Sequence, residues 1–394
     1  MRTPVAVLST LIIVAIGLPG HAQETTTFTC GTPVEYEGVA LYAMPYSGLW
    51  GFVDGAGDWA ITPAFTRVTD FSEGRAIVAG EYDGFWGVID EEGTWVHEPT
   101  FGAQSYGHLG ERRVHTPPLE PYSEGCSAGV GPTTGEPPYF LDRSGNRHWE
   151  YDPPAALADE EVIRYGSFSE GKAWFHVFTM DFDGEYGWLD AQGNVILPVV
   201  YGRAGDFVGG LAPAETPDQY SAFINVDGEP VIPSKWTLYG AEAFSDDIAL
   251  VKTGPFDLAY IRADGNWAFR AATNAATGES LHIISGGAFS EGLVALTVEI
   301  NDVPVLVYAD EEGNVAFVPS ETIGAHVCSR PETPGVGQFR NGLARLMTAS
   351  DPSACDVVFM WAELADYEGV EYVYVDHDGQ VVMRSSEMTA PEPE

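Results

Sequence analysis

Lysine is nearly absent from this sequence. Its 394 residues contain 18 Lys and Arg against 58 Asp and Glu, and only three of the basic residues are lysines: Lys172, Lys235 and Lys252. The formal net charge of −40 at pH 7 repels nucleic acid and anionic membrane surfaces and attracts cations or basic partners. We therefore expect no nucleic-acid partner, and solubility is the simplest use of the charge.

Long amphipathic helical stretches are also missing. No long segment places apolar residues at i, i+3, i+4 and i+7 without an interrupting Gly or Pro. The 45 glycines and 27 prolines suit many short strands joined by turns. With 45% apolar residues, the chain is not a disordered one.

Long charge-free apolar runs are missing too, except near the N-terminus. There Arg2 precedes the apolar run Val5 to Leu18, and Gly20-His21-Ala22 offers small residues for cleavage before Gln23. We expect residues 1–22 to be a signal peptide and residues 23–36 a short N-terminal segment. The run is short for a membrane span, so no transmembrane segment is expected in the mature chain. The protein is expected in the periplasm or outside the cell.

The cysteine pattern lacks any C-x-x-C spacing, which disfavours a zinc site. The four cysteines are Cys30, Cys126, Cys328 and Cys355. An even number in an exported chain indicates two disulfides, for which three connectivities exist. We favour Cys30–Cys126 with Cys328–Cys355.

A short hairpin recurs along the chain, first at Trp50 to Ile61. An apolar residue at every second position leads into an Asp-x-x-Gly turn, and a second apolar run follows. Asp at the first turn position caps the turn, and Gly at the last adopts positive φ without steric cost. Eight hairpins are predicted, with turn glycines Gly57, Gly93, Gly145, Gly193, Gly228, Gly265, Gly313 and Gly379. Prolines are expected to end several return strands, at Pro63, Pro99, Pro198, Pro233 and Pro319.

A second landmark, Phe-Ser-Glu-Gly, lies between hairpins and precedes a further strand. Clear copies begin at Phe71, Phe168 and Phe289, weaker ones begin at Phe207, Phe244 and Phe339, and Leu109-Gly110-Glu111 is the most eroded copy. Because both landmarks recur in phase, they indicate a repeat far more strongly than either does alone. The shortest spacings give a bare repeat of about 36 residues.

Longer spacings contain inserted segments, which in repeat arrays map to loops and often to a binding face. They are residues 116–138, 150–166, 270–287, 320–336 and 349–370, the last containing a candidate short helix at 357–364.

The two ends of the array are half-repeats. Residues 37–42 look like a strand without a preceding hairpin, and residues 372–383 like a hairpin without the strand that follows it. Each end supplies what the other lacks, as in a ring closed by strands from both ends. We favour such a β-propeller-like ring over an open β-solenoid, because a ring leaves no unpaired edges. The array spans 37–383, and 384–394 is a polar tail.

These units resemble WG repeats, a bacterial tandem repeat named for its Trp-Gly pair. Trp50-Gly51 and Trp86-Gly87 carry the pair, Tyr186-Gly187 has Tyr for Trp, and the segment from Phe71 to Ala76 matches the family's second landmark. Later repeats depart from the pattern by replacing the second Gly with Ala222, Ala259, Val307 and Val373. The resemblance implies an all-β repeat protein with an interaction or envelope role. The family has no shared activity, so no catalytic residue is carried over.

Catalytic and metal-binding motifs are lacking as well. There is no Gly-x-Ser-x-Gly elbow, no phosphate-binding loop and no metal-ligand spacing among the nine histidines. Two stretches, Asp181 to Gly184 and Asp376 to Gly379, resemble the start of a Ca²⁺ loop but lack the further carboxylates, so hairpin turns account for them. Periodic tryptophans such as Trp50, Trp86 and Trp188 are expected to be core residues rather than a sugar-stacking surface.

The sequence thus predicts an exported, monomeric, non-enzymatic β-repeat scaffold without cofactor. It would bind a protein or a glycan through the loops between its repeats. The alternative is a secreted hydrolase acting on glycans, with carboxylates on one rim. Two facing carboxylates in a cleft, one of them in an apolar setting, would favour the enzyme.

Overall fold

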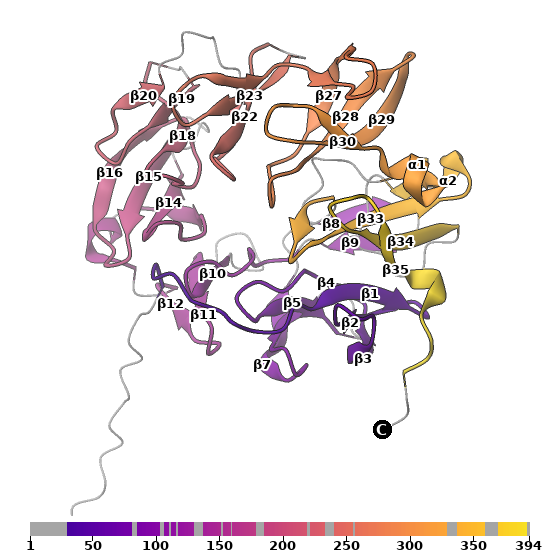
Figure 1. The fold of residues 1–394 in the computed structure, drawn as a ribbon. Helices are drawn as coiled ribbons and strands as arrows, with labels where there is room; N and C mark the ends of the chain where they lie inside the picture. The colour runs from indigo at the N-terminus through magenta and orange to yellow at the C-terminus, as the bar shows by residue number, and fades with distance from the viewer. Residues whose placement is uncertain are drawn as a thin grey trace, which may run out of the picture.

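The strands form a ring of eight antiparallel blades, which is a β-propeller (Figure 1). The computed structural model describes residues 30–80, 85–102, 106–109, 112–115, 117–129, 137–150, 153–158, 160–178, 185–218, 221–232, 240–254, 257–328, 337–358 and 369–391. The predicted all-β repeat array and its closed ring are confirmed. In blade 4, strands β14, β15 and β16 run from the inside of the ring to its outside (Figure 1).

Consecutive strands pair within each blade. Blades 1 to 4 consist of β1 (Tyr42–Tyr46), β2 (Leu49–Val53) and β3 (Trp59–Phe65); β4 (Arg67–Val68), β5 (Ala76–Ala79), β6 (Phe85–Ile89) and β7 (Trp95–Gly102); β10 (Cys126–Gly129), β11 (Tyr139–Asp142) and β12 (Arg147–His148); and β13 (Val162–Tyr165), β14 (Lys172–Val177), β15 (Glu185–Asp190) and β16 (Val195–Tyr201).

The second half of the ring follows the same plan, with one extra strand in blade 8. Blades 5 to 8 consist of β17 (Arg203–Ala204), β18 (Ala212–Glu215), β19 (Ser221–Ile224) and β20 (Pro230–Ile232); β21 (Gly240–Ala241), β22 (Ile248–Lys252), β23 (Leu258–Arg262) and β24 (Trp267–Phe269); β27 (Ile283–Gly286), β28 (Val294–Ile300), β29 (Val303–Ala309) and β30 (Val315–Phe317); and β31 (His326–Val327), β32 (Phe339–Arg340), β33 (Leu343–Ala349), β34 (Val370–Val375) and β35 (Val381–Arg384).

Small elements occupy several inserted segments. They are the hairpins β8 (Tyr106–Leu109) with β9 (Arg112–His115) and β25 (Ala272–Thr273) with β26 (Ser280–Leu281), the helices α1 (Pro319–Ile323) and α2 (Pro352–Val358), and the 3₁₀ turns η1 (Ala155–Leu157) and η2 (Ser385–Glu387). Helix α2 starts before the helix expected at 357–364, and residues 359–368 lie outside the described part of the chain.

The Trp-Gly pair has a packing reason. The indole of Trp50 is buried, whereas a Cβ on Gly51 would lie 2.5 Å from the carbonyl oxygen of Ile61. There β3 bulges, since Trp50 pairs with Phe65 and Phe52 with Ile61. The glycine is therefore needed where the bulged return strand approaches closely. The prediction that Pro63 ends its strand is wrong, because β3 continues through it at this bulge; β7 and β16 likewise pass through Pro99 and Pro198.

The second landmark is a tight turn that places two residues in the left-handed region. In blade 2, Glu73 has φ 49° and Gly74 has φ 71°. The copy expected at Leu109 to Glu111 is wrong, because Leu109 ends β8. Blade 3 instead makes this turn at Tyr122-Ser123-Glu124-Gly125, where Glu124 has φ 49° and Tyr122 is 2% exposed. Residues 116–138 are therefore not a simple insertion, since they contain this turn and β10.

The Ser and Glu of this turn tie each blade to the next. The Ser72 hydroxyl donates to the carbonyl oxygen of Tyr122 at 2.6 Å, and Glu73 accepts from the Gly125 amide at 2.9 Å. We call this pair of hydrogen bonds the latch. It recurs between blades 3 and 4, 4 and 5, 6 and 7, and 7 and 8. Blade 5 cannot form a latch with blade 6, because Val208 and Gly209 replace the Ser and the Glu.

The ring closes by packing of blade 8 against blade 1. Their strands belong to separate sheets, so the two ends of the array meet without sharing a sheet. Trp50 meets Tyr372 edge-on at 4.9 Å between ring centroids, and the Tyr374 hydroxyl donates to the Ala43 carbonyl oxygen at 2.8 Å. Aromatic burial and buried hydrogen bonds therefore close the ring.

The tryptophans before the hairpin turns are core residues. Trp50, Trp86 and Trp188 are at most 2% exposed, which confirms the core expectation for them. Trp59, Trp95 and Trp267, which follow the turns, are only half-buried. The buried set packs in clusters that bridge neighbouring blades, as where Trp188 meets Phe207 of blade 5. The ring is thus held by many similar apolar seams.

Candidate functional site

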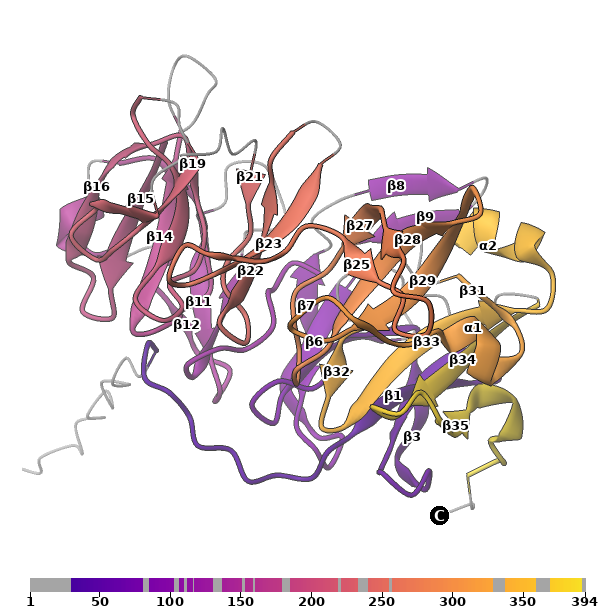
Figure 2. The same ribbon diagram turned by 45° about the horizontal axis from the view of Figure 1, so that its top comes forward.

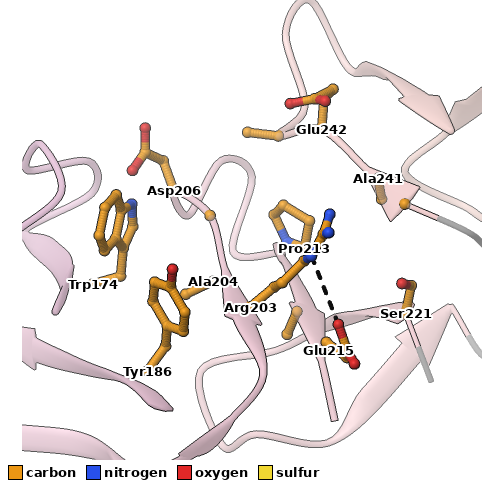
Figure 3. Close-up of a pocket in the computed structure, with 14 residues that line it drawn as sticks. Trp174, Tyr186, Arg203, Ala204, Asp206, Pro213, Glu215, Ser221, Ala241 and Glu242 are labelled. Atoms are coloured by element: carbon orange, nitrogen blue, oxygen red, sulfur yellow. Dashed lines mark ion pairs between the residues drawn. The ribbon is translucent and has the colours of Figure 1, made fainter. Parts of the chain in front are cut away.

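A cavity of about 520 Å³ lies where blades 4, 5 and 6 meet, and we call it the pocket (Figure 3). Blade 4 contributes β14 and β15, blade 5 contributes β17 to β19, and blade 6 contributes β21. The pocket is lined by Trp174, Tyr186, Arg203, Ala204, Gly205, Asp206, Pro213, Ala214, Glu215, Ser221, Gly240, Ala241, Glu242 and Ala243. Its volume suits part of a ligand, such as one or two side chains or sugar rings.

Two aromatic rings form the blade 4 wall of the pocket. Trp174 and Tyr186 meet edge-on at 5.7 Å between ring centroids (Figure 3). The guanidinium of Arg164 lies 5.7 Å from the Trp174 ring, and His176 stacks on Tyr186 at 4.1 Å. Burial and the nearby Arg164 lower the pKa of His176, so this ring is neutral at pH 7. The wall is therefore an aromatic surface that already makes a cation–π contact with one guanidinium, that of Arg164.

Charged side chains line the other walls. Arg203 on β17 forms a loose ion pair with Glu215 on β18, with 3.7 Å between Nε and Oε2 (Figure 3). The Arg203 side chain is 73% exposed, so this pair is weak. Glu242, from the segment after β21, faces the pocket from blade 6. With Asp206 ionised, carboxylates outnumber the single lining cation.

Asp206 is the most perturbed of these groups. Burial raises its pKa to about 6; a hydrogen bond from the Trp174 side chain opposes the rise, and the nearby Glu120 adds to it. Its Oδ1 is shielded from solvent and has no hydrogen-bond partner among the described residues. A shielded carboxylate oxygen of this kind is normally hydrogen-bonded, so Asp206 can accept a hydrogen bond from a ligand.

The predicted turn glycines stand where the hairpins reverse. All eight have φ between 73° and 88°. In seven hairpins an Asp or Asn oxygen accepts two backbone N–H groups, as Asp54 does from Ala56 and Asp58. Asp376 and Gly379 belong to such a turn, and residues 181–184 lie outside the described residues. These glycines shape the scaffold and none lines the pocket.

The structure joins the cysteines as Cys30–Cys126 and Cys328–Cys355. Near Cys30, the Gly31 amide donates to the Glu124 carbonyl oxygen at 2.9 Å. The segment from Cys30 to β1 runs from beside β11 and β12 along blades 3 and 2 to blade 1 (Figures 1 and 2). The first disulfide thus anchors the N-terminal segment to the propeller.

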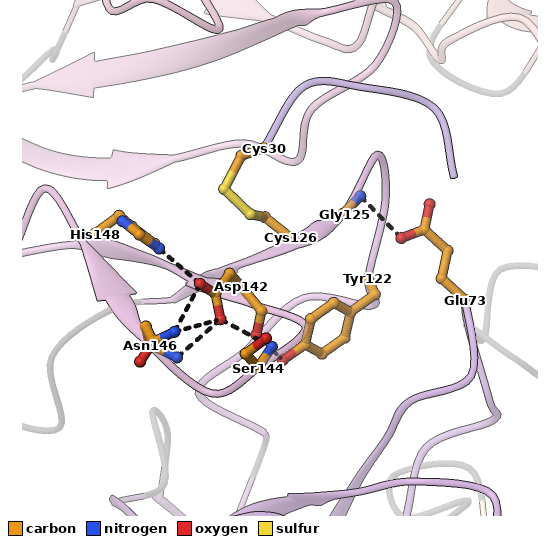
Figure 4. The surroundings of a disulfide bond; sticks show 9 residues. All are labelled: Cys30, Glu73, Tyr122, Gly125, Cys126, Asp142, Ser144, Asn146 and His148. Carbon is orange, nitrogen blue, oxygen red and sulfur yellow. Dashed lines mark hydrogen bonds and ion pairs between the residues drawn. A yellow bond between two sulfur atoms is a disulfide. The ribbon is translucent and has the colours of Figure 1, made fainter. Parts of the chain in front are cut away.

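A polar cluster lies beside the Cys30–Cys126 disulfide (Figure 4). Burial acts to raise the pKa of Asp142, but hydrogen bonds from His148, Asn146 and Ser144 outweigh it and lower the pKa. His148 Nε2 lies 2.9 Å from Asp142 Oδ2. Asp142 opens the hairpin turn of blade 3, so the cluster stabilises that turn. Within the described part of the chain, no group of three or more His, Cys, Asp and Glu is arranged to hold a metal ion.

The pocket residues are those that the sequence reasoning missed. Its candidate binding surface was the set of inserted loops, and parts of these lie outside the described residues. One signal was present: the blade 5 turn, Phe207-Val208-Gly209-Gly210, departs from Phe-Ser-Glu-Gly next to Asp206. The copies at Phe244 and Phe339 also depart from this motif, so the break alone does not single out the blade that carries the pocket.

Fold and pocket define an eight-bladed β-propeller with a concave, acidic and aromatic site shared by three blades. Three stretches, residues 50–79, 186–216 and 222–254, match the model of the WG containing repeat. These matches assign WG repeats to the chain, as its Trp-Gly pairs indicated. The comparison with curated proteins gave no match.

Several solved structures are similar to this chain in fold alone. BamB from Moraxella catarrhalis is 14% identical, with a TM-score of 0.40 over 87% of this chain and 92% of that chain. A prolyl endopeptidase is 11% identical, with a TM-score of 0.45 over 81% of this chain and 49% of that chain. YCF48 bound to a D1 peptide is 12% identical, with a TM-score of 0.33 over 72% and 84%. At these values none carries a functional argument.

No helix among the described residues has the length and apolarity needed to cross a membrane. Residues 1–29, which contain the expected signal peptide, lie outside the described residues, so that expectation stays a prediction.

Proposed function

We propose that this protein is an exported, monomeric, non-enzymatic propeller that binds a partner protein in the pocket across blades 4 to 6. The observation that carries the proposal is the pocket itself: about 520 Å³, an aromatic wall of Trp174 and Tyr186, and the unsatisfied carboxylate oxygen of Asp206. Concave sites with aromatic walls and a few convergent polar groups are the usual form of a binding site.

Export is supported by two disulfides, because such bonds persist in oxidising compartments. We propose cleavage of residues 1–22 and a location in the periplasm or outside the cell. The charge of −40 favours basic partners over nucleic acid or anionic membranes.

The test is capture of envelope proteins on the immobilised mature chain, followed by measurement of binding with the purified partner. Trp174→Ala should weaken binding of the captured protein at least tenfold, because a stacking surface at the pocket is lost. Trp267→Ala is the matched control, since Trp267 is another half-buried strand tryptophan that does not line the pocket. Equal binding by both variants would place the interaction elsewhere and contradict the proposal.

A glycan hydrolase is the second candidate, favoured by one observation. Asp206, whose pKa is raised, shares the pocket with Glu215 and Glu242, and a carboxyl of raised pKa beside a second carboxyl is the pattern of a glycosidase acid and its partner. The assay is release of reducing ends from a panel of envelope glycans. Product formation that Asp206→Asn lowers at least a hundredfold would establish this candidate; no product from the wild-type protein would reject it.

A further inference from the structure

The repeat itself shows which chemical group satisfies an aspartate at the position of Asp206. Asp206 directly precedes the turn aromatic Phe207, and Asp70 directly precedes Phe71. Asp70 pairs with the buried guanidinium of Arg345, whose Nη1 lies 3.2 Å from Asp70 Oδ1. Trp174 stands where Arg345 stands in its own blade, three residues after the last glycine of the turn. The two contacts are not equivalent, because Arg345 lies in blade 8, two blades before that of Asp70, whereas Trp174 lies in blade 4, directly before that of Asp206. Asp206 thus keeps the aspartate of the turn but has an indole, and not a guanidinium, beside it.

We propose that the pocket binds the guanidinium group of an arginine side chain of the partner protein, with the carboxylates of Asp206 and Glu242 as acceptors. This inference rests on the proposed function, because it specifies the chemistry of that same pocket.

The charge of the lining supports a cationic ligand. Asp206, Glu215 and Glu242 face one guanidinium, that of Arg203, which Glu215 already pairs. An incoming guanidinium would offer Asp206 the donors that its environment lacks. Reaching Oδ1 requires a rotation of the carboxylate about its Cβ–Cγ bond, which is a broad and soft torsion.

The aromatic wall favours guanidinium among cations. Arg164 lies over the Trp174 ring, so this indole already accepts a planar cation from its own chain. A guanidinium stacks on aromatic faces and forms two parallel hydrogen bonds to a carboxylate, whereas an ammonium is a compact and more strongly hydrated charge. The net charge of the protein adds long-range attraction without specificity.

The experiment titrates acetyl-Gly-Arg-Gly-amide into the folded mature chain labelled with ¹⁵N-tryptophan, at 0.15 M salt and pH 7.5. The indole N–H signal of Trp174, assigned with Trp174→Phe, should shift on saturation. The same peptide with citrulline should bind at least tenfold more weakly, because citrulline has a similar shape without the charge. Asp206→Asn and Glu242→Gln should each weaken arginine binding, the former at least tenfold.

Glu229→Gln is the matched control, since Glu229 is an exposed carboxylate of blade 5 outside the pocket and its change alters the net charge equally. It should change binding less than twofold. Equal weakening by Asp206→Asn and Glu229→Gln would show attraction by net charge alone and overturn the inference. Equal binding of the citrulline peptide would also overturn it.

Failure of this inference and of the proposed function give different results. If the arginine peptide leaves the Trp174 signal unchanged while the captured partner still depends on Trp174, the pocket binds a different chemistry and only this inference is wrong. If the partner is also indifferent to Trp174→Ala, both are wrong. Titrating a glycan panel and a lysine peptide while following the same Trp174 indole signal would then identify the ligand class that the pocket binds.

The pH dependence gives a second readout. Because the pKa of Asp206 is about 6, its ionised fraction falls about tenfold between pH 7.5 and 5, and arginine binding should weaken accordingly. The charged and titratable groups facing Asp206 or lying beside it are Glu120, Arg164, His176, Tyr186, Arg203, Glu215 and Glu242. His176→Gln should keep the pH dependence and Asp206→Asn should abolish it; the opposite result would assign it to the histidine.

Discussion

Two regions of the ring each contain an aspartate directly before the turn aromatic, and the surroundings of the two aspartates differ. Where blades 8, 1 and 2 meet, Asp70 is paired with the buried Arg345, and burial acts to lower the pKa of Arg345 while Asp70 raises it above its usual value. Where blades 4, 5 and 6 meet, Asp206 has an indole as its neighbour and a free carboxylate oxygen. The difference teaches that the group beside this aspartate, a guanidinium or an indole, separates an internal ion pair from a ligand pocket.

The two regions also differ in how firmly they are fastened. The closure region contains the Cys328–Cys355 disulfide and a large apolar cluster around Trp50. Blades 4 to 7 contain no cysteine. Binding sites are commonly found in the less tightly held parts of a fold.

The largest effect is expected from Arg345→Met, which leaves the partly buried Asp70 carboxylate without its partner. Removing one member of a buried ion pair costs about 3–5 kcal/mol. Urea unfolding should show this loss. Arg203→Met is the matched control in the pocket region, where a loss below about 1 kcal/mol is expected for an exposed pair. Similar losses of unfolding free energy would show that the two ion pairs contribute equally to stability despite their different exposure.

Removal of the Cys328–Cys355 disulfide by the double change to Ser should be nearly as costly. The cysteines are separated by 27 residues, for which the chain-entropy estimate is about 3–4 kcal/mol. Hydrogen exchange should rise in blades 8 and 1 and stay unchanged around the pocket. An equal rise of hydrogen exchange in both regions would contradict the claim that the two regions are stabilised independently.

Trp174→Arg converts the pocket arrangement toward that of the closure region. A guanidinium near Asp206 should lower its pKa from about 6 by roughly 1–3 units, toward its ordinary value. NMR titration of the Asp206 carboxyl measures the change, and the arginine peptide should no longer bind. A pKa that stays near 6 would mean that an arginine at position 174 does not reach the Asp206 carboxylate.

Asp206→Asn should stabilise the protein at neutral pH by about 1–2 kcal/mol. The pKa of Asp206 is higher in the folded chain than in the unfolded chain, so folding stability falls as pH rises from about 4 to about 6 and then stays level. The gain should therefore be present at pH 7.5 and absent at pH 3.5. Thermal unfolding at both values tests this, with Glu229→Gln as control.

The smallest effect is expected from installing the missing latch with Val208→Ser and Gly209→Glu. Gly209 has φ 61°, where the equivalent Glu73 has φ 49°, and a Cβ on Gly209 meets no atom within 4 Å. Two hydrogen bonds contribute about 0.5–1.5 kcal/mol each, against a left-handed cost of about 1 kcal/mol. The net gain should be about 1 kcal/mol, with added protection of the Asp247 amide against exchange.

Ser245→Ala removes the corresponding hydroxyl from the latch between blades 6 and 7 and should cost about 1 kcal/mol. If neither variant changes stability, the latches are a geometric consequence of the turn and do not fasten the ring.

The hairpins and most of the turns were predictable because their causes are local. A turn that needs positive φ calls for Gly, and its first residue is an Asp or Asn in seven of the eight hairpins. The Tyr122 copy was missed because Tyr stands for Phe inside a segment rich in Gly and Pro. The bulge at Pro63 was missed because a proline is locally a strand terminator, and only the approach of Gly51 makes room for it.

What the sequence by itself determined is the repeat: its hairpins, its phase, its buried tryptophans and its family, since each depends on residues close together in the chain. What only the tertiary structure decided is the packing of blade 8 on blade 1 and the pocket. Arg345 reaches Asp70, and Trp174 reaches Asp206, across blade boundaries far apart in sequence. Whether an aspartate meets a guanidinium or an open cavity depends on that distant partner, and no local pattern encodes it.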